Sequence, residues 1–349
     1  MKRQILHIVH VVQCIIIAII ITFQNTDSFA QKNKPSENFI GFSVTTYDGL
    51  KLPAQVMFSS KPSKNILVFI MGGSPYDEKG NTGGSWDDDC ISISEKDEFY
   101  NRFITTTSSM GYTIITMAKR SFIYPCKVPR PSLNDFALDI VYLIKELKMR
   151  NIYYEEDKLV LIGHSEGSIV ATKVLGLLKQ KPSGCILLGS ASLAFNFNTQ
   201  KWEEFYLNNM MREISHFSDE QIQNVFDLFK EVHTRIHTID EETFENVWKK
   251  NKDPIDIAPW ESYNCIREYC FYNPVPNIMT SNLPILICVG EQDTAMPLVL
   301  AKRTYNELQK MGFTKATIEV IKDEVHQYKK EDVFNIIDDW IDTYINKIK

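Results

Sequence analysis

The stretch Lys158-Leu-Val-Leu-Ile-Gly163-His-Ser165-Glu-Gly167-Ser-Ile-Val-Ala-Thr-Lys-Val-Leu175 decides the fold of this chain. It begins with an apolar run, residues 158–162, that has the length and content of a buried strand. After the motif Gly-x-Ser-x-Gly, apolar residues recur at the spacing of one helix face, at Val170, Val174, Leu177 and Leu178. The sequence therefore predicts a strand, a tight turn and a helix, in that order.

A serine at the centre of such a turn is a candidate nucleophile. The turn is so sharp that only glycine tolerates the crowding at Gly163 and Gly167, and it lifts the Ser165 hydroxyl out of the sheet. The same turn aims the amide of Glu166 at a carbonyl under attack. A glycine-bearing turn without catalytic role is the alternative, and the flanking strand and helix favour the nucleophile.

Other apolar runs of strand length recur along the chain, at residues 66–71, 112–118, 185–188, 284–289 and 317–321. A further pair of strands is predicted from Phe39 to Phe58, around an Asp48-Gly49 turn. Helical patterns separate several runs: one capped by Ser132, one at residues 298–311 and one at 332–347. Alternating helices and continuous apolar strands predict an α/β fold, a mostly parallel central sheet flanked by helices on both faces.

One segment interrupts this alternation. Residues 192–281 contain no strand-like run of comparable quality, and they carry helical patterns with aromatic and methionine side chains instead. Long insertions within a compact domain are usually functional, so we expect a helical cap inserted into a core formed by residues 31–191 and 282–349. A small packed subdomain without catalytic part is the alternative.

A serine nucleophile needs a base, and the base needs a group that orients it. His326 follows the last strand-like run, at the edge where open α/β sheets place their ligands, and is the predicted base. His164 is next to the serine, but we expect the turn to point its side chain elsewhere. The remaining candidates belong to the predicted cap, at His216, His233 and His237.

The orienting acid is expected at the end of another strand. Asp293 follows the run at 284–289 and precedes a helix, with Glu291 as a nearby competitor. Asp323 is closer to His326 in sequence, but it could not easily orient a ring from the same loop. The predicted catalytic residues are therefore Ser165, Asp293 and His326, in that order along the chain.

The developing oxyanion needs a second amide donor besides Glu166. Paired glycines at Gly72 and Gly73 follow the run at 66–71 and let the backbone approach a ligand, so the Gly73 N–H is predicted, with Ser74 as the second choice. A phosphate-binding loop would need a lysine and a following helix, whereas here Pro75 and the acidic residues after it disfavour anions.

The N-terminus has the order of a secretory signal. Lys2 and Arg3 precede an apolar stretch over residues 5–23, and small residues at Ser28 and Ala30 predict cleavage after Ala30, which makes residues 1–30 a signal peptide. An uncleaved anchor is the alternative, although polar residues interrupt the stretch. Both interpretations place the rest of the chain outside the cytoplasm, secreted or periplasmic.

The composition limits the classes of partner and cofactor that we expect for this chain. The chain of 349 residues is 44% hydrophobic and 23% charged with a net charge of −6, so nothing predicts nucleic acid or an anionic membrane as a partner. Cys185 and Cys288 lie in apolar runs and are expected to be inert thiols. Four cysteines in polar contexts could form disulfides: Cys90, Cys126, Cys265 and Cys270. Cysteine and histidine spacing predicts neither a metal site nor a cofactor.

Taken together, these motifs resemble the α/β-hydrolase family. Gly-His-Ser-Glu-Gly at 163–167 and the loop Gly-Ser-Pro-Tyr-Asp-Glu at 73–78 are similar to those of capped bacterial serine esterases. The chain departs from that pattern with Gly-Gly-Ser for Gly-Ser-Gly, with Lys119-Arg120-Ser121 for the usual Arg-Gly, and with Ser168 for a second glycine. These departures concern the geometry of the loops rather than the triad.

The resemblance implies a serine hydrolase that cleaves carboxylic esters through an acyl-enzyme intermediate, without cofactor, on a small-molecule ester. A peptidase or thioesterase of the same fold is the enzymatic alternative, and the resemblance extends to dipeptidyl-peptidase-like enzymes, whose β-propeller this chain lacks. A binding protein on the same scaffold is the non-enzymatic alternative, because a fold alone does not fix a function.

Overall fold

The structure, a computed structural model, describes residues 39–59, 65–86, 92–125, 131–152, 158–189, 268, 272–293, 295–296 and 298–347. The predicted signal peptide, nearly all of the predicted cap and the four cysteines in polar contexts lie outside the described residues and stay predictions. Within the described ranges, no helix has both the length and the apolar character that crossing a bilayer requires.

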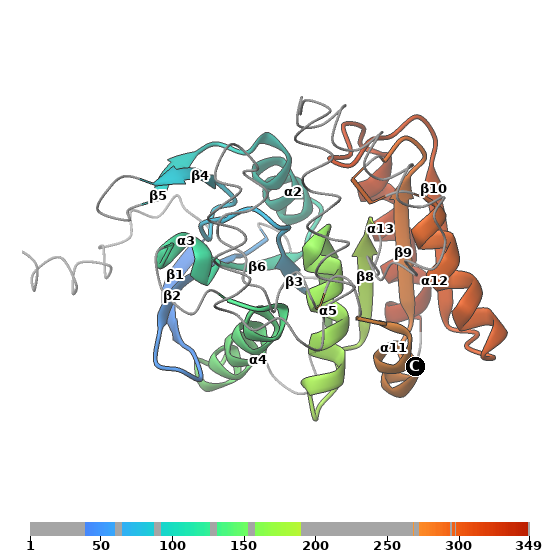
Figure 1. Ribbon diagram of the computed structural model, residues 1–349, viewed down its shortest axis with the longest axis horizontal. Helices are drawn as coiled ribbons and strands as arrows, with labels where there is room; N and C mark the ends of the chain where they lie inside the picture. Colours follow the sequence, from blue (N-terminus) through green and yellow to red (C-terminus); the bar gives the residue numbers. More distant parts are fainter. Residues whose placement is uncertain are drawn as a thin grey trace, which may run out of the picture.

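A sheet of eight strands forms the centre, in the order β1-β2-β6-β3-β7-β8-β9-β10 (Figure 1). Its strands are β1 (Phe39–Thr45), β2 (Lys51–Met57), β3 (Ile66–Ile70), β6 (Thr113–Met117), β7 (Leu159–His164), β8 (Gly184–Leu188), β9 (Ile285–Gly290) and β10 (Ala316–Ile321). Strand β2 is antiparallel to both of its neighbours, and every pair from β6 to β10 is parallel. The predicted strands and the mostly parallel sheet are thus confirmed.

Helices cover both faces of this sheet (Figure 1). One apolar core lies between the sheet and α4 (Leu133–Met149), α5 (Glu166–Leu177), α11 (Val275–Ser281) and α12 (Leu298–Lys310). The second lies between the sheet and α2 (Glu98–Ser109) and α13 (Asp332–Ile341), which continues as the π-helical turn η2 (Asp342–Asn346). As predicted, Ser132 caps α4, through a capping box with Asp135.

Two-sided burial explains why the strands appear in the sequence as continuous apolar runs. In β3, Ile66, Val68 and Ile70 enter the first core, whereas Leu67 and Phe69 enter the second. A strand with one face in water would alternate apolar and polar residues instead. Cys185 and Cys288 are fully buried within this sheet as free thiols, as expected.

Several local features differ from the sequence prediction or were not predicted at all. Leu177 is 42% exposed, because α5 ends there and its last turn lies beyond the packed face that holds Val170 and Val174. The hairpin of β4 (Thr82–Trp86) and β5 (Ser92–Glu95) was not predicted, since its strands are short and rich in glycine and serine. Helix α2 was also missed, although Phe99, Tyr100, Phe103 and Ile104 form its buried face.

Candidate active site

The loops after β3, β7, β9 and β10 carry the predicted site residues. Because these strands are parallel, their carboxyl ends meet at one edge of the sheet. Residues that are far apart in the sequence therefore come together there, as the sequence analysis expects.

Ser165 occupies a strained turn between β7 and α5. Its φ of 56° and ψ of −127° are a conformation that side-chain-bearing residues rarely adopt. A Cβ atom on Gly163 would lie 2.1 Å from the carbonyl oxygen of Gly167, and one on Gly167 would lie 2.0 Å from the carbonyl oxygen of Ile70. Both distances are far inside contact range, so the predicted need for glycine on either side of the serine is confirmed.

His326 is paired with Asp293. The His326 Nδ1 and the Asp293 Oδ2 are 2.8 Å apart, and the Asp293 side chain is fully buried. The other carboxylate oxygen of Asp293 accepts the Met296 amide at 2.7 Å. A carboxylate only accepts hydrogen bonds, so Nδ1 carries the proton, and in the neutral ring Nε2 then keeps the lone pair of a base.

The competing acids lie elsewhere. Glu291 is exposed, and its Oε2 accepts the amide of Asp323, itself exposed, at 3.3 Å. These two residues hold the β9 and β10 loops together at the rim. The structure thus pairs the histidine with Asp293 and gives Glu291 and Asp323 a contact with each other.

The loop that carries His326 is fixed by a buried carboxylate. Glu324, which is 2% exposed, accepts the amides of Lys329 at 2.7 Å and Lys330 at 2.8 Å. Its own carbonyl accepts the Gln292 amide at 2.8 Å, which ties the loop to the one that carries the aspartate. Both members of the His326–Asp293 pair are therefore held by the backbone of the same two loops.

His164 lies under the site rather than away from it, which corrects the sequence expectation. Its Nε2 is 2.8 Å from the carbonyl oxygen of His326, and the two rings are 4.6 Å apart between centroids. The carbonyl can only accept, so His164 Nε2 carries the proton and Nδ1 accepts the Tyr100 hydroxyl at 2.7 Å. Complete burial, aided by the nearby His326, holds the pKa of His164 well below its usual 6.5.

Tyr100 continues this chain of hydrogen bonds to the glycine loop. Its hydroxyl accepts the Gly72 amide at 2.8 Å while it donates to His164. Gly72 also lies against the nucleophile, because a Cβ atom built on it would be 3.1 Å from Ser165 Cβ. Three hydrogen bonds thus connect the loop beside Ser165 to the loop that carries His326. Tyr100 was not predicted from the sequence, and His164 was considered only as a base and set aside.

The predicted oxyanion donors lie on the two sides of Ser165. Glu166 begins α5 directly after the serine, and Gly73 follows Gly72 in the loop after β3. The Gly72 amide already donates to the Tyr100 hydroxyl, so the next amides along this loop, those of Gly73 and Ser74, are the candidates for the second oxyanion donor. The structure brings this loop and the start of α5 together through a side chain that the sequence analysis mentioned only as a departure, Lys119.

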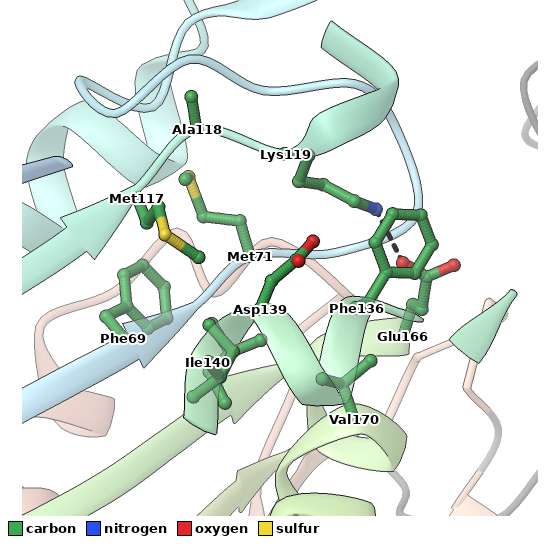
Figure 2. Close-up of a pocket in the computed structure, with 11 residues that line it drawn as sticks. Phe69, Met71, Met117, Ala118, Lys119, Phe136, Asp139, Ile140, Glu166 and Val170 are labelled. Carbon is green, nitrogen blue, oxygen red and sulfur yellow. Dashed lines mark hydrogen bonds and ion pairs between the residues drawn. The ribbon is translucent and has the colours of Figure 1, made fainter. Parts of the chain in front are cut away.

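Lys119 and Glu166 form a buried ion pair, drawn in Figure 2. The two charged atoms are 2.5 Å apart, with the side chains 9% and 4% exposed. Burial raises the pKa of Glu166, and the ammonium of Lys119 opposes that rise. Beside the pair lies a cavity of about 30 Å³, room for about one water molecule, whose lining includes Phe136 and Asp139.

The fold is similar to those of solved esterases. A thermostable carboxyl esterase from Bacillus coagulans has a TM-score of 0.55 at 16% identity, over 90% of this chain and 99% of that one. An esterase from Pyrococcus furiosus has a TM-score of 0.53 at 15% identity, over 90% and 96%. An acylaminoacyl peptidase from Pyrococcus horikoshii matches with a TM-score of 0.52 at 14% identity, over 90% of this chain but 43% of that chain.

Sequence comparison alone finds no relative: no protein-family model matches this chain, and no curated protein matches it significantly. The resemblance is carried by the three-dimensional arrangement. The chain has an α/β-hydrolase fold, with an eight-stranded, mostly parallel sheet and helices on both faces.

Proposed function

We propose that the protein is a serine hydrolase that cleaves carboxylic esters, with Ser165 as nucleophile, His326 as base and Asp293 as the orienting acid. The observation that carries the proposal is the 2.8 Å contact between His326 Nδ1 and the buried Asp293 carboxylate. It leaves a basic Nε2 in the loop that hydrogen-bonds to His164, the residue next to a strained serine. A serine hydroxyl becomes a useful nucleophile only with such a base.

The proposed reaction runs in two halves. Ser165 Oγ attacks the ester carbonyl while His326 Nε2 takes its proton, and the amides of Gly73 and Glu166 bind the oxyanion. Collapse of the tetrahedral adduct returns the proton to the leaving alcohol and leaves an acyl-serine. Water, deprotonated by the same histidine, then releases the carboxylic acid and restores the Ser165 hydroxyl.

A peptidase or thioesterase is the second candidate, because the acylaminoacyl peptidase of Pyrococcus horikoshii shares this fold. The chemistry of the acyl-serine would be the same, and the leaving group would differ. A series of p-nitrophenyl esters of increasing acyl length, assayed beside aminoacyl-nitroanilides and acyl thioesters, separates the candidates. We expect turnover of the esters to exceed that of the nitroanilides by at least about a hundredfold in kcat/KM.

The nucleophile is tested by covalent labelling. A fluorophosphonate should modify wild-type protein at Ser165, and Ser165→Ala should remove both labelling and at least about a thousandfold of kcat. Ser281→Ala is the matched control, since that buried hydroxyl donates only to the Ile278 carbonyl of its own helix. Modification of another serine with activity intact in Ser165→Ala would refute the proposal.

We further propose that the chain acts outside the cytoplasm, after cleavage at Ala30, and that the predicted cap, residues 192–281, covers the substrate site with the part that precedes α11, since α11 itself packs in the first core. The support is the signal-like order of charged, apolar and small residues at the N-terminus, and the helical patterns of the inserted segment. N-terminal sequencing of protein isolated from the outside of expressing cells tests the cleavage: a chain that begins at Gln31 supports it, and one that retains Lys2 refutes it.

A further inference from the structure

The Lys119 side chain lies directly beneath the glycine loop of the site. Its Nζ contacts the carbonyl oxygen of Gly72 at 2.6 Å, the carbonyl oxygen of Gly73 at 3.1 Å and Glu166 Oε1 at 2.5 Å. An ammonium group has three protons to donate, so these three acceptors use its full capacity. The main chain adds a fourth tie, because the Lys119 amide donates to the carbonyl of Tyr76 in the same loop at 2.8 Å.

Holding those two carbonyls also fixes the direction of the amides proposed to bind the oxyanion. The carbonyl of Gly72 and the N–H of Gly73 belong to one planar, trans peptide group, in which they point in opposite directions. The carbonyl of Gly73 and the N–H of Ser74 are related in the same way. When Lys119 holds both oxygens from below, the two N–H groups must point to the opposite side of the loop, and a bonded carbonyl also makes its amide a stronger donor.

The third contact connects this loop to the other donor. Glu166 supplies the carboxylate that binds Lys119, and its own backbone amide is the predicted donor on the α5 side. Figure 2 shows the Lys119 ammonium joined to the Glu166 carboxylate by a dashed line, with Phe136 alongside. The ammonium lies 4.5 Å from the centroid of that ring, in surroundings of low polarity where ionic contacts are strong.

We propose that Lys119 is a positioning residue that sets the spacing and direction of the oxyanion donors on both sides of Ser165. The inference rests on the proposed function, since it concerns the transition state of that reaction. The alternative is a buried ion pair that only stabilises the fold. The two differ in one respect: a positioning residue affects binding of a tetrahedral adduct, whereas a merely structural one affects unfolding alone.

The test uses the full chain and the double variant Lys119→Met/Glu166→Leu. An apolar pair of similar size leaves no unpaired buried charge, so the protein is expected to fold. We expect kcat to fall by about 10- to 100-fold with a smaller change in KM, somewhat less than the loss of a whole oxyanion donor. The dissociation constant of an arylboronic acid, which forms a tetrahedral adduct with the serine, should rise by the same factor as kcat/KM falls.

Lys173→Met is the matched control. Lys173 lies on α5, the helix that begins at Glu166, and it pairs with a glutamate, Glu268, at 3.1 Å. In the described structure it contacts no part of the glycine loop. We expect it to keep the wild-type kcat and boronate affinity. The variant Lys119→Arg, whose guanidinium can extend into the adjacent cavity, should recover part of the kcat lost in the double variant.

Each result is decisive. Wild-type kcat and boronate affinity in a double variant that merely melts earlier would overturn the role of Lys119. If the double variant does not fold, the comparison is made between Lys119→Arg and Lys119→Gln, and equal kcat in those two overturns it. A wild-type protein without esterase activity or boronate binding would instead remove the proposed function itself, so the two failures are distinguishable.

Discussion

Replacing Tyr100 with phenylalanine tests whether the hydrogen bonds beneath the site hold it together. The substitution removes one oxygen that accepts the Gly72 amide at 2.8 Å and donates to His164 Nδ1 at 2.7 Å. Tyr100 is 3% exposed and both partners are buried, so neither gains water in exchange. Each of the two buried groups left unsatisfied costs about 1–3 kcal/mol, which predicts a loss of about 2–6 kcal/mol in the free energy of unfolding.

Tyr112→Phe supplies the comparison within the same apolar core. The Tyr112 ring is also buried, but its hydroxyl donates to Asp338, a partly exposed carboxylate that water can solvate after the change. Tyr112→Phe should therefore lower the free energy of unfolding by about 1 kcal/mol. Urea unfolding of wild type and both variants measures these differences, and ester turnover should fall in Tyr100→Phe because Gly72 loses its anchor. Equal unfolding free energies for the two variants would refute the reasoning.

Three further outcomes are expected. Asp293→Asn should lower kcat by about 10³- to 10⁴-fold through loss of the orienting carboxylate, while Glu291→Gln stays near wild type, and the reverse ranking in ester assays would move the acid to Glu291. His164 is neutral in the folded protein and takes a proton only in the unfolded chain, so below about pH 6.5 the protein should lose up to about 1.4 kcal/mol of stability per pH unit. His164→Asn should flatten that slope in urea unfolding at pH 5.0–7.5. An unchanged slope would contradict the assignment. Gly167→Ala, whose new Cβ meets a carbonyl oxygen at 2.0 Å, should cost about 3 kcal/mol or more, whereas Gly41→Ala, with open space around it, should melt as wild type, and similar melting of both would refute the crowding argument.

Much of the fold could be predicted because burial on both faces leaves a simple pattern in the sequence. Strands such as β3 and β9 consist entirely of buried residues, so they appear as uninterrupted apolar runs. The turn at Ser165 could be predicted for a second reason, since its backbone geometry requires glycine at fixed positions. The contact between Asp293 and His326 follows from topology, because the carboxyl ends of parallel strands meet at one edge.

The supporting side chains could not be predicted by the same logic. Tyr100 belongs to α2, whose buried face is no different in pattern from a helix that only packs, and its partner His164 lies 64 residues away. Lys119 follows β6 in the sequence like many residues at strand ends, and its three acceptors are identifiable only in space. A hydrogen bond between distant segments depends on side-chain direction, and neither hydrophobic period nor motif spacing records that direction.

The parallel pairing of β8 with β9 has a consequence for how this chain folds. Ile285 lies beside Cys185 in the sheet, although roughly a hundred residues separate the two strands, about five times the connection between β7 and β8. For a flexible connection, a fivefold increase in length adds only about 1.4 kcal/mol of closure entropy. The length of this connection can therefore change between related chains at little thermodynamic cost to the sheet. The effect on the folding rate is larger: folding becomes slower, because β9 and β10 can join the sheet only after a contact of very long sequence separation forms.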